Sequence, residues 1–301
     1  MIAFTDAGVP TAPDAAAQWD KKYEGTVRSA WTKNKIVERE IYLRMTDLPN
    51  HWIEWTFEVC VPPINRILSI GCGDGAHELA IGRRRYASYI RAFDASSVAI
   101  EQARASAVAE NLDIDFRVST FEEFCRSEPE GPLMDAVLFC GSLHHVIEIE
   151  AMLFAVRRHL RPGGFVIVNE YVGPCYQLYS ERQLSIVNNF LKRVPAEFKV
   201  EPDAQLDLPT IEMIMAADPT EGVRANLIRH LLPLFFNRHY ERLIGGGLLH
   251  PIFGLLDDNR VNDGSPASVA LAEMLVAADS ELTRLGVLDH EFLFTVMTNP
   301  G

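Results

Sequence analysis

The chain is poor in basic residues and lacks any long hydrophobic run. Lys and Arg number 28 against 41 Asp and Glu, which gives the 301 residues a formal net charge of -13. Such a surplus of negative charge repels phosphate backbones and anionic lipid alike, so we expect neither nucleic acid nor a membrane as a partner. The first twenty residues hold no Lys or Arg, and no stretch approaches the roughly 18 apolar residues of a membrane span. We therefore expect a soluble, cytoplasmic protein without a signal peptide.

Cysteine is also scarce. The five cysteines are spread along the chain, form no Cys-x-x-Cys pair and are odd in number. That usage is typical of reduced thiols and argues against a disulfide framework or a cysteine-based zinc site. A cluster of Asp and His at ligand spacing is missing as well, so no dedicated catalytic metal is predicted. An acceptor that carries a pyrophosphate would still be able to bring Mg²⁺ with it.

Between residues 66 and 170, short apolar runs alternate with helical patterns. Apolar residues make up 48% of the chain, which is enough to bury a core. Runs rich in Ile, Val and Phe predict buried strands at 67–70, 89–93, 114–118, 134–139 and 165–169. Helical spacing between them predicts helices at 77–86, 97–111 and 147–160. Regular alternation implies right-handed crossovers onto a parallel sheet, so we predict a doubly wound, Rossmann-like α/β core.

The flanking segments differ from this core. We expect a helical arm over 1–65, the α/β core over 66–173, a helical cap over 174–234 and a C-terminal part of the core over 235–301. In the cap, helices are predicted at 181–193, 209–217 and 219–232, the last with Asp218 as N-cap, Pro219 at its first position and Glu221 at its third. Strands at 235–244 and 291–297, and helices at 248–256 and 266–285, complete the expected chain.

The first predicted strand runs directly into a glycine turn, Gly71-Cys72-Gly73-Asp74-Gly75, followed by a helix. Glycines let the backbone turn sharply and approach a ligand, and the free N–H groups of the helix start lie beside it. Asp94, at the end of the second strand, suits a ribose hydroxyl pair. These residues alone fit a nicotinamide dinucleotide site equally well, and the glycines could also serve only close packing.

Four motifs in order resemble the class I S-adenosylmethionine-dependent methyltransferases. They are IGCGDG (70–75), AFDAS (92–96), MDAVLFCGSLHHV (134–146) and LRPGGFVIVNE (160–170). The resemblance implies S-adenosylmethionine as cofactor and a seven-stranded, mostly parallel sheet whose last strand is antiparallel. Residues 169–174, 218–224 and 246–250 further resemble a bacterial branch of small-molecule methyltransferases.

The resemblance also implies a set of cofactor contacts. Ser69 stands where many relatives carry an acid, and Thr120 and Phe121 stand where relatives often place an Asp after the third strand. Thr120 can still accept a hydrogen bond from the adenine amino group, and Phe121 can lie against the ring. Trp31 and the segment 19–23 resemble an arm that folds over the cofactor. The expected cofactor residues are Gly71, Cys72, Gly73, Gly75, Asp94, Ala95, Thr120, Phe121, Cys140, Ser142 and Trp31.

Methyl transfer needs little beyond alignment, because the methyl group already sits on a sulfonium that leaves as a neutral thioether. A base is needed only where the acceptor loses a proton. Glu170, at the end of the fifth strand, and His144 or His145, after the fourth, are the catalytic candidates. Glu170 could instead hold the substrate, and His145 could pack beside the cofactor. Tyr171, Tyr176 and His250 are candidate acceptor residues, with packing in a helical cap as the alternative.

The sequence thus predicts methyl transfer from S-adenosylmethionine to an oxygen or carbon of a small metabolite of the secondary-metabolite, isoprenoid or sugar type, by a monomer or homodimer. One alternative is an NAD(P)-dependent oxidoreductase, although no Tyr-x-x-x-Lys pair follows at the active face. Another is a non-catalytic protein that binds S-adenosylmethionine. The acceptor itself and the choice among O-, C- and N-methylation stay open.

Overall fold

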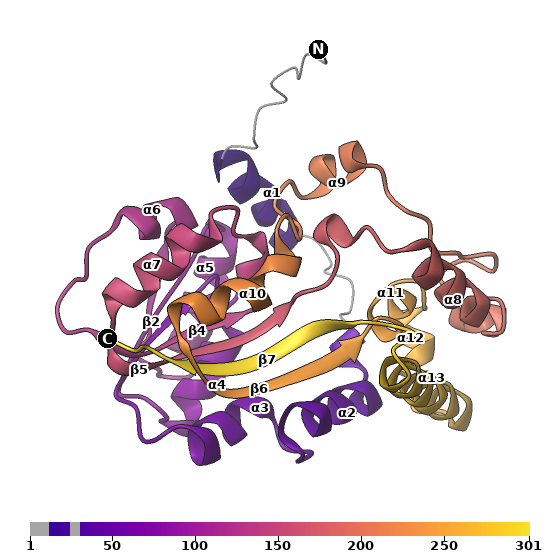
Figure 1. Cartoon of the computed structure of the whole chain (residues 1–301), viewed down its shortest axis with the longest axis horizontal. Helices are drawn as coiled ribbons and strands as arrows, with labels where there is room; N and C mark the ends of the chain where they lie inside the picture. The colour runs from indigo at the N-terminus through magenta and orange to yellow at the C-terminus, as the bar shows by residue number, and fades with distance from the viewer. Residues whose placement is uncertain (1–11, 25–30) are drawn as a thin grey trace, which may run out of the picture.

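The computed structural model describes residues 12–24 and 31–301 (Figure 1). Residues 1–11 and 25–30 of the expected arm lie outside the described residues. So do the first eleven of the twenty residues in which we expected no signal peptide. Within the described ranges, no helix combines the length and the apolar character that crossing a membrane requires.

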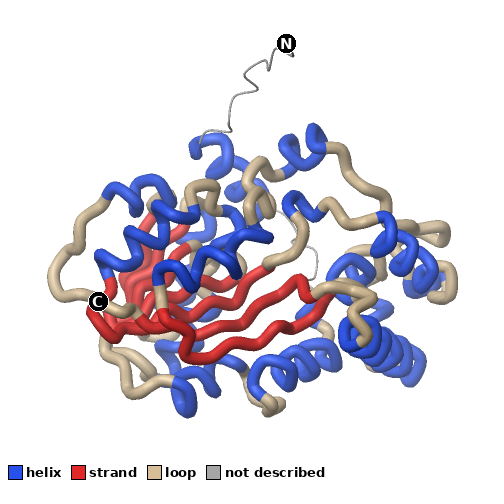
Figure 2. The backbone as a smooth tube through the Cα atoms, viewed as in Figure 1, coloured by secondary structure: helices blue, strands red, loops and turns tan. Residues whose placement is uncertain are grey.

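Seven strands of the described chain form one sheet in the order β3-β2-β1-β4-β5-β7-β6. Their bounds are β1 Arg66–Ile70, β2 Tyr89–Asp94, β3 Asp115–Val118, β4 Met134–Cys140, β5 Leu160–Tyr171, β6 Asn237–Gly246 and β7 His290–Thr298. Strands β1 to β5 pair in parallel, whereas β7 runs antiparallel to both β5 and β6. This confirms the predicted doubly wound sheet with one reversed strand, drawn in red in Figure 2.

Helices cover both faces of the sheet, as Figure 2 shows. The α-helices are α1 Ala12–Glu24, α2 Lys35–Thr46, α3 Trp52–Trp55, α4 Ala76–Arg84, α5 Ser97–Ala109, α6 Phe121–Arg126, α7 Ile149–His159, α8 Glu181–Leu191, α9 Ile211–Ala217, α10 Ala225–Phe235, α11 Leu249–Phe253, α12 Asp258–Val261 and α13 Pro266–Arg284. Helices α2 to α5 pack on one face, and α6, α7 and α10 pack on the other.

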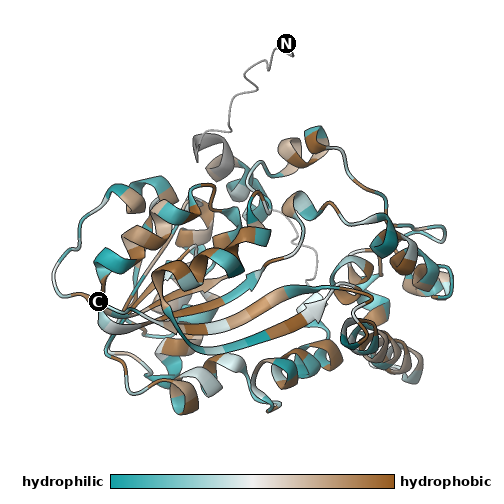
Figure 3. Ribbon diagram, viewed as in Figure 1, coloured by the Kyte–Doolittle hydropathy of each residue, from teal (hydrophilic) through white to brown (hydrophobic). Residues whose placement is uncertain are grey.

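Strand β4 shows why the central strands are apolar on both sides. Leu138 faces the cluster that contains α2 to α4, while Val137 and Phe139 face the cluster that contains α7 and α10, and all three are buried. Successive side chains of a strand point to opposite faces, so a strand covered on both faces becomes a continuous apolar run. The brown colour of the central strands in Figure 3 follows this pattern.

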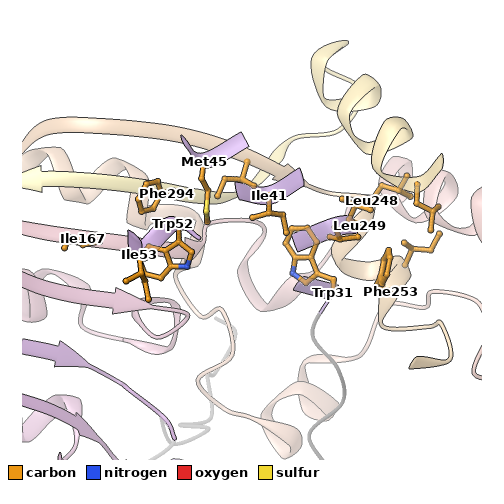
Figure 4. Packing of buried hydrophobic residues seen from close by; sticks show 14 of the residues in the cluster. Trp31, Ile41, Met45, Trp52, Ile53, Ile167, Leu248, Leu249, Phe253 and Phe294 are labelled. Atoms are coloured by element: carbon orange, nitrogen blue, oxygen red, sulfur yellow. The ribbon is translucent and has the colours of Figure 1, made fainter. Parts of the chain in front are cut away.

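The segment from Trp31 onward is part of the main core. Met45 of α2 and Trp52 lie near Phe294 of β7, Ile41 lies between Met45 and Trp31, and Trp31 lies nearer Leu248 and Leu249 at the start of α11 (Figure 4). Arg44 of α2 also donates to Asp279 of α13 over 2.6 Å, and the Asp279 carboxylate is fully buried. Helices α2 and α13 therefore pack together beside β6, at the end of the sheet. The domain bounds that the sequence suggested stay a prediction.

The predicted helix over 219–232 is wrong in its first part. Helix α9 ends at Ala217, residues 218–224 form a turn, and α10 begins at Ala225. The Asp218 side chain accepts hydrogen bonds from the backbone N–H and hydroxyl of Thr220, and Gly222 adopts a left-handed φ of +62°. Asp218 thus starts a turn rather than a helix.

Helix α6 was not predicted. Thr120 begins it with a capping box, in which the Thr120 hydroxyl accepts from the Glu123 N–H and the Glu123 carboxylate accepts from the Thr120 N–H. Strand bounds also shift, because β5 extends back to Leu160 and β6 runs on through Gly246, two residues beyond the predicted end at 244.

Candidate functional site

The glycine turn after β1 is held by the neighbouring strand β2. The N–H groups of Gly71 and Cys72 donate to the carbonyl of Phe93 over 2.9 and 3.1 Å, and the N–H of Gly73 donates to Asp94 Oδ2 over 2.9 Å. Gly71 has a φ of +70°, and a Cβ at this position would lie 2.5 Å from Cβ of Ser142. Only glycine fits this close passage of β1 beside the loop that follows β4.

Asp94 serves the loop after β2 as well. Its Oδ1 accepts from the Ser96 N–H over 2.9 Å while Oδ2 holds Gly73. Burial raises the pKa of Asp94, although these backbone hydrogen bonds oppose that shift. The carboxylate therefore fixes the two loops that face each other across the cavity described next.

A cavity of about 260 Å³ lies at the carboxyl ends of β1, β2 and β4. Nearly all of the expected cofactor residues line it: Gly71, Cys72, Gly73, Asp94, Ala95, Thr120, Phe121, Cys140 and Ser142. Gly75 does not line it, because its missing side chain makes room for Phe116 and Ala103 behind the turn. Trp31 lies at a neighbouring cavity instead.

Helix α1 lies over this cavity. Trp19 and Tyr23 line it, and burial raises the pKa of the Tyr23 hydroxyl. Asp20 accepts from the Ser96 hydroxyl over 2.6 Å and from the N–H of Val98 over 3.2 Å, so it ties α1 to the first turn of α5. The carboxylate also complements the positive end of that helix.

Glu170, at the end of β5, is 1% exposed and fully engaged. Its Oε1 accepts from the N–H groups of Ser142 and Leu143, each over 2.7 Å, and its Oε2 lies 2.7 Å from Nδ1 of His144. Since a carboxylate only accepts, Nδ1 of His144 carries a proton, and in the neutral ring Nε2 then keeps a free lone pair. Burial alone would lower the pKa of His144. The hydrogen bond to Glu170 and the negative charge of Glu170, followed by the charges of Glu221 and Asp218, raise the pKa of His144 above its ordinary value.

His145 is held by the turn at 218–224. Its Nδ1 lies 3.1 Å from the hydroxyl oxygen of Thr220, and that hydroxyl donates to Asp218 over 2.7 Å. Nδ1 therefore donates, and Nε2 again keeps its lone pair. Burial and the adjacent His144 lower the pKa of His145 well below its ordinary value. Trp19 meets the His145 ring edge-on, with 4.9 Å between ring centroids.

A second cavity, of about 650 Å³, adjoins the first and shares Ala76, His77, Cys140 and Gly141 with it. The second cavity is lined by Trp31, His144, Glu170, Tyr171 and Phe292, among others. Of the expected acceptor residues, only Tyr171 lies on this cavity. Two chambers therefore meet at the loop after β4.

The other two expected acceptor residues lie elsewhere. Tyr176 lines a separate hollow with Trp19, Gln177 and Glu221. His250 packs behind Tyr171, with 5.8 Å between their ring centroids. Burial lowers the pKa of His250 to about 4, which keeps its imidazole neutral at pH 7.

Sequence reasoning missed Glu78, which lies beside Ser69, the residue that stands where many relatives carry an acid. Ser69 donates its hydroxyl to Oε1 of Glu78, which is 2% exposed on α4. Burial raises the pKa of Glu78 to about 7. Within the described chain, its Oε2 has no hydrogen-bond partner. The one available signal was an acid in the first turn of a predicted core helix.

Part of the chain is similar to known proteins. Residues 67–164 match a family model described as a methyltransferase domain. The ubiquinone biosynthesis O-methyltransferases of Alkalilimnicola ehrlichii and Brucella anthropi are 35% and 33% identical over 102 and 103 residues. Each alignment covers 34% of this chain, which spans only 40% of the length of these curated relatives.

Solved structures resemble the chain over most of its length. The cyclase SpnF is 16% identical, with a TM-score of 0.50 over 92% of this chain and 85% of its own. A protein solved in work on the conversion of a disulfide bond into a thioacetal group during echinomycin biosynthesis is 17% identical, with a TM-score of 0.51 over 94% of this chain and 92% of its own. At such identities the likeness shows the fold alone.

Proposed function

Because residues 67–164 match a methyltransferase domain, we propose that this protein transfers a methyl group from S-adenosylmethionine to a small molecule. The observation that carries the proposal is the pair of adjoining cavities. One follows the glycine turn, and the other is lined by aromatic side chains together with His144 and Glu170. A methyl donor and an acceptor held in such neighbouring chambers would meet at their shared wall, and alignment supplies most of the rate gain in methyl transfer.

In this proposal the cofactor occupies the first cavity. The backbone of the turn at Gly71 and Gly73 passes close to it, and Asp94 receives its ribose hydroxyls. Phe121 lies against the adenine ring. The Thr120 hydroxyl already accepts from the N–H of Glu123 over 3.1 Å, so it meets the adenine amino group only with its remaining lone pair.

The acceptor occupies the second cavity, beside His144. We assign Glu170 as the positioning residue that holds Nδ1 of His144, and Nε2 of His144 as the atom that takes a proton from the acceptor. S-adenosylmethionine, when bound, would supply the methyl group, because its carbon–sulfur bond would break as the acceptor atom bonds to the methyl carbon and a neutral thioether would remain. His145 lies at the cofactor cavity and holds the loop after β4 in place. The names of the curated relatives favour oxygen as the acceptor atom.

Calorimetry with S-adenosylhomocysteine and with NADH tests the cofactor. We expect the first to bind and the second not to bind. Asp94→Ala should weaken S-adenosylhomocysteine by about 1–3 kcal/mol, because a charged hydrogen-bond acceptor is lost. The exposed acid Asp113 provides the matched control, and Asp113→Ala should change nothing. Binding of NADH without S-adenosylhomocysteine would overturn the proposal in favour of an oxidoreductase.

The acceptor is sought by incubating the protein with S-adenosylmethionine carrying an isotope-labelled methyl group and fractions of small molecules. Mass spectrometry then identifies the product that gains the label. Label on oxygen or carbon of a small molecule is the expected result. Binding of S-adenosylhomocysteine without any labelled product from a broad set of fractions would favour a non-catalytic binding protein.

A further inference from the structure

Three side chains from two distant segments converge beside the cavities: His145 lines the cofactor cavity, His144 lines the acceptor cavity, and Glu221 lines the hollow of Tyr176. His144 and His145 follow β4, and Glu221 belongs to the turn before α10. One ligand atom of each lies within 4.8 Å of the others. Nε2 of His144 is 3.8 Å from Glu221 Oε1, and Nε2 of His145 is 4.0 Å from Glu221 Oε2. These separations are too long for direct hydrogen bonds.

The hydrogen bonds around the three side chains leave lone pairs facing one another. Nδ1 of His144 donates to Glu170, and Nδ1 of His145 donates to Thr220. Both Nε2 atoms are therefore acceptors, and neither has a hydrogen-bond donor among the described residues. The Glu221 carboxylate adds two more acceptor oxygens. Converging lone pairs repel one another unless a proton or a cation lies between them.

We propose that His144, His145 and Glu221 bind one divalent transition-metal ion of the zinc class. Donor atoms around a four-coordinate zinc ion, at roughly 2.0–2.2 Å from it, lie about 3.3 Å apart. The donors lie within 4.8 Å of one another, so side-chain movements of about 1 Å would bring them to that spacing. Two imidazoles favour zinc, cobalt or a similar ion over Mg²⁺ or Ca²⁺, which prefer oxygen ligands.

Each ligand also has the outer partner that metal sites usually provide. Glu170 holds Nδ1 of His144, a carboxylate–histidine arrangement that fixes the ring and strengthens Nε2 as a ligand. Thr220, itself held by Asp218, does the same for His145. Gln177 donates to Oε1 of Glu221 over 2.7 Å and orients the carboxylate. The sequence predicted no metal because Glu221 lies far along the chain from the two histidines.

The three ligands leave a fourth position open, and here the inference rests on the proposed function. His144 lines the acceptor cavity and His145 lines the cofactor cavity, so the open position lies where the two meet. An acceptor hydroxyl bound there would have a lowered pKa. It would release its proton to water and attack the methyl carbon as the carbon–sulfur bond breaks. The substrate class is then an alcohol or phenol, and the ion replaces His144 in activating it.

Titration of the metal-stripped full chain with Co²⁺, followed by visible absorption, tests the site. We expect one equivalent of Co²⁺ to give the spectrum of a four- or five-coordinate ion, displaced by Zn²⁺ and without thiolate charge-transfer bands. His144→Gln and Glu221→Gln should each weaken Co²⁺ at least ~100-fold, and Asp218→Asn, which acts through Thr220, should weaken it about 10–100-fold. His230→Gln, at an exposed histidine of α10, is the matched control and should bind as the wild type does.

Circular dichroism confirms that each variant is folded. The proposal is overturned if Co²⁺ gives no such spectrum, if its bands are those of thiolate ligation, or if the ligand variants bind it as well as the wild type. S-Adenosylhomocysteine binding is measured on the same samples. Cofactor binding and labelled product from metal-stripped protein, without a Co²⁺ spectrum, would remove the metal site and leave the proposed function standing. Co²⁺ binding without cofactor binding would support the metal site and overturn the proposed function.

Discussion

The two adjoining cavities are built from the sequence in different ways. Most of the cofactor cavity comes from the loops after β1, β2, β3 and β4, which the parallel sheet places side by side. The acceptor cavity combines side chains from distant segments, such as Trp31, Tyr171 and Phe292. Carboxyl ends of parallel strands always share one edge, so strand order alone assembles the first cavity. The second depends on how the arm from Trp31 to Trp52, β6 and β7 pack around that edge.

The largest effect that would test this contrast is expected at the glycine turn. Gly71→Ala places a Cβ 2.5 Å from Ser142 Cβ at a left-handed φ, so the turn must shift where the cofactor approaches. We expect S-adenosylhomocysteine affinity to fall more than ~100-fold, together with roughly 1–2 kcal/mol of backbone strain. Calorimetry measures the affinity, and thermal unfolding measures the strain.

Gly131→Ala is the matched control for Gly71. Gly131 also has a left-handed φ, of +81°, but a Cβ there would meet nothing within 4 Å. The control should lose similar stability and keep its cofactor affinity. Equal affinities in the two variants would show that the turn at Gly71 does not approach the cofactor.

A pH-dependent effect is expected at Glu78, which accepts a hydrogen bond from Ser69 of β1. Burial raises the pKa of Glu78 from 4.5 to about 7, so the folded state binds this proton more tightly than the unfolded state. Its contribution to stability is complete below pH 4.5 and is lost as the pH rises through 7, by up to about 3 kcal/mol. Glu291, whose pKa burial also raises to about 7, adds to the same slope.

Glu78→Gln should therefore flatten the loss of stability between pH 5 and pH 8.5. Denaturant unfolding of the wild type and the variant at both values measures this difference. Glu101→Gln, at an exposed acid of α5, should keep the wild-type slope. An unchanged slope in Glu78→Gln would mean that Glu78 is ionised at pH 5 in the folded protein, against the assignment made here.

Sequence reasoning predicted the parts that depend on local patterns. The strand order around β1, the glycine turn and Asp94 follow from apolar runs and from the geometry of a parallel sheet. The meeting of Glu170 with His144 was foreseeable too, since β4 and β5 are neighbours and both residues lie at or just after a strand end. No comparable rule predicts the position of a residue when that position depends on the packing of distant segments.

The turn at 218–224 illustrates what sequence reasoning could not supply. Asp218, Pro219 and Glu221 satisfy a helix N-terminus pattern, yet the Asp218 side chain bonds to Thr220 and Gly222 turns left-handed. Local hydrogen bonding competes with helix formation at such residues, and tertiary contacts decide which wins. That choice places Thr220 and Glu221 beside the two histidines. The helix start that was wrongly predicted at Pro219 and the failure to predict Thr220 and Glu221 as site residues thus have one cause.

Glu170→Gln tests the positioning role at the border between the two cavities. An amide would turn its NH₂ group toward Nδ1 of His144, which moves the ring proton to Nε2 and removes the lone pair that faces the acceptor. We expect turnover to fall at least ~10²-fold while S-adenosylhomocysteine affinity stays nearly intact. Steady-state kinetics with the identified acceptor and calorimetry measure the two. Unchanged turnover with a raised KM would instead assign Glu170 to substrate holding.

The smallest expected effect lies at Arg224, which anchors the turn at 218–224. Its guanidinium binds both carboxylate oxygens of Glu150 over 2.7 Å and the carbonyl of Ile147 over 3.1 Å, which attaches the turn at 218–224 to the start of α7. The pair is partly exposed, so Arg224→Met should cost only about 0.5–1 kcal/mol of stability. Thermal unfolding measures that cost, with Arg284→Met, in an exposed pair on α13, as the matched control. Thr220 lines the cofactor cavity, so its looser placement should weaken S-adenosylhomocysteine binding a few-fold and change the acceptor KM less. If the acceptor KM rises by the same factor, the two cavities share this turn equally and the contrast between them does not hold.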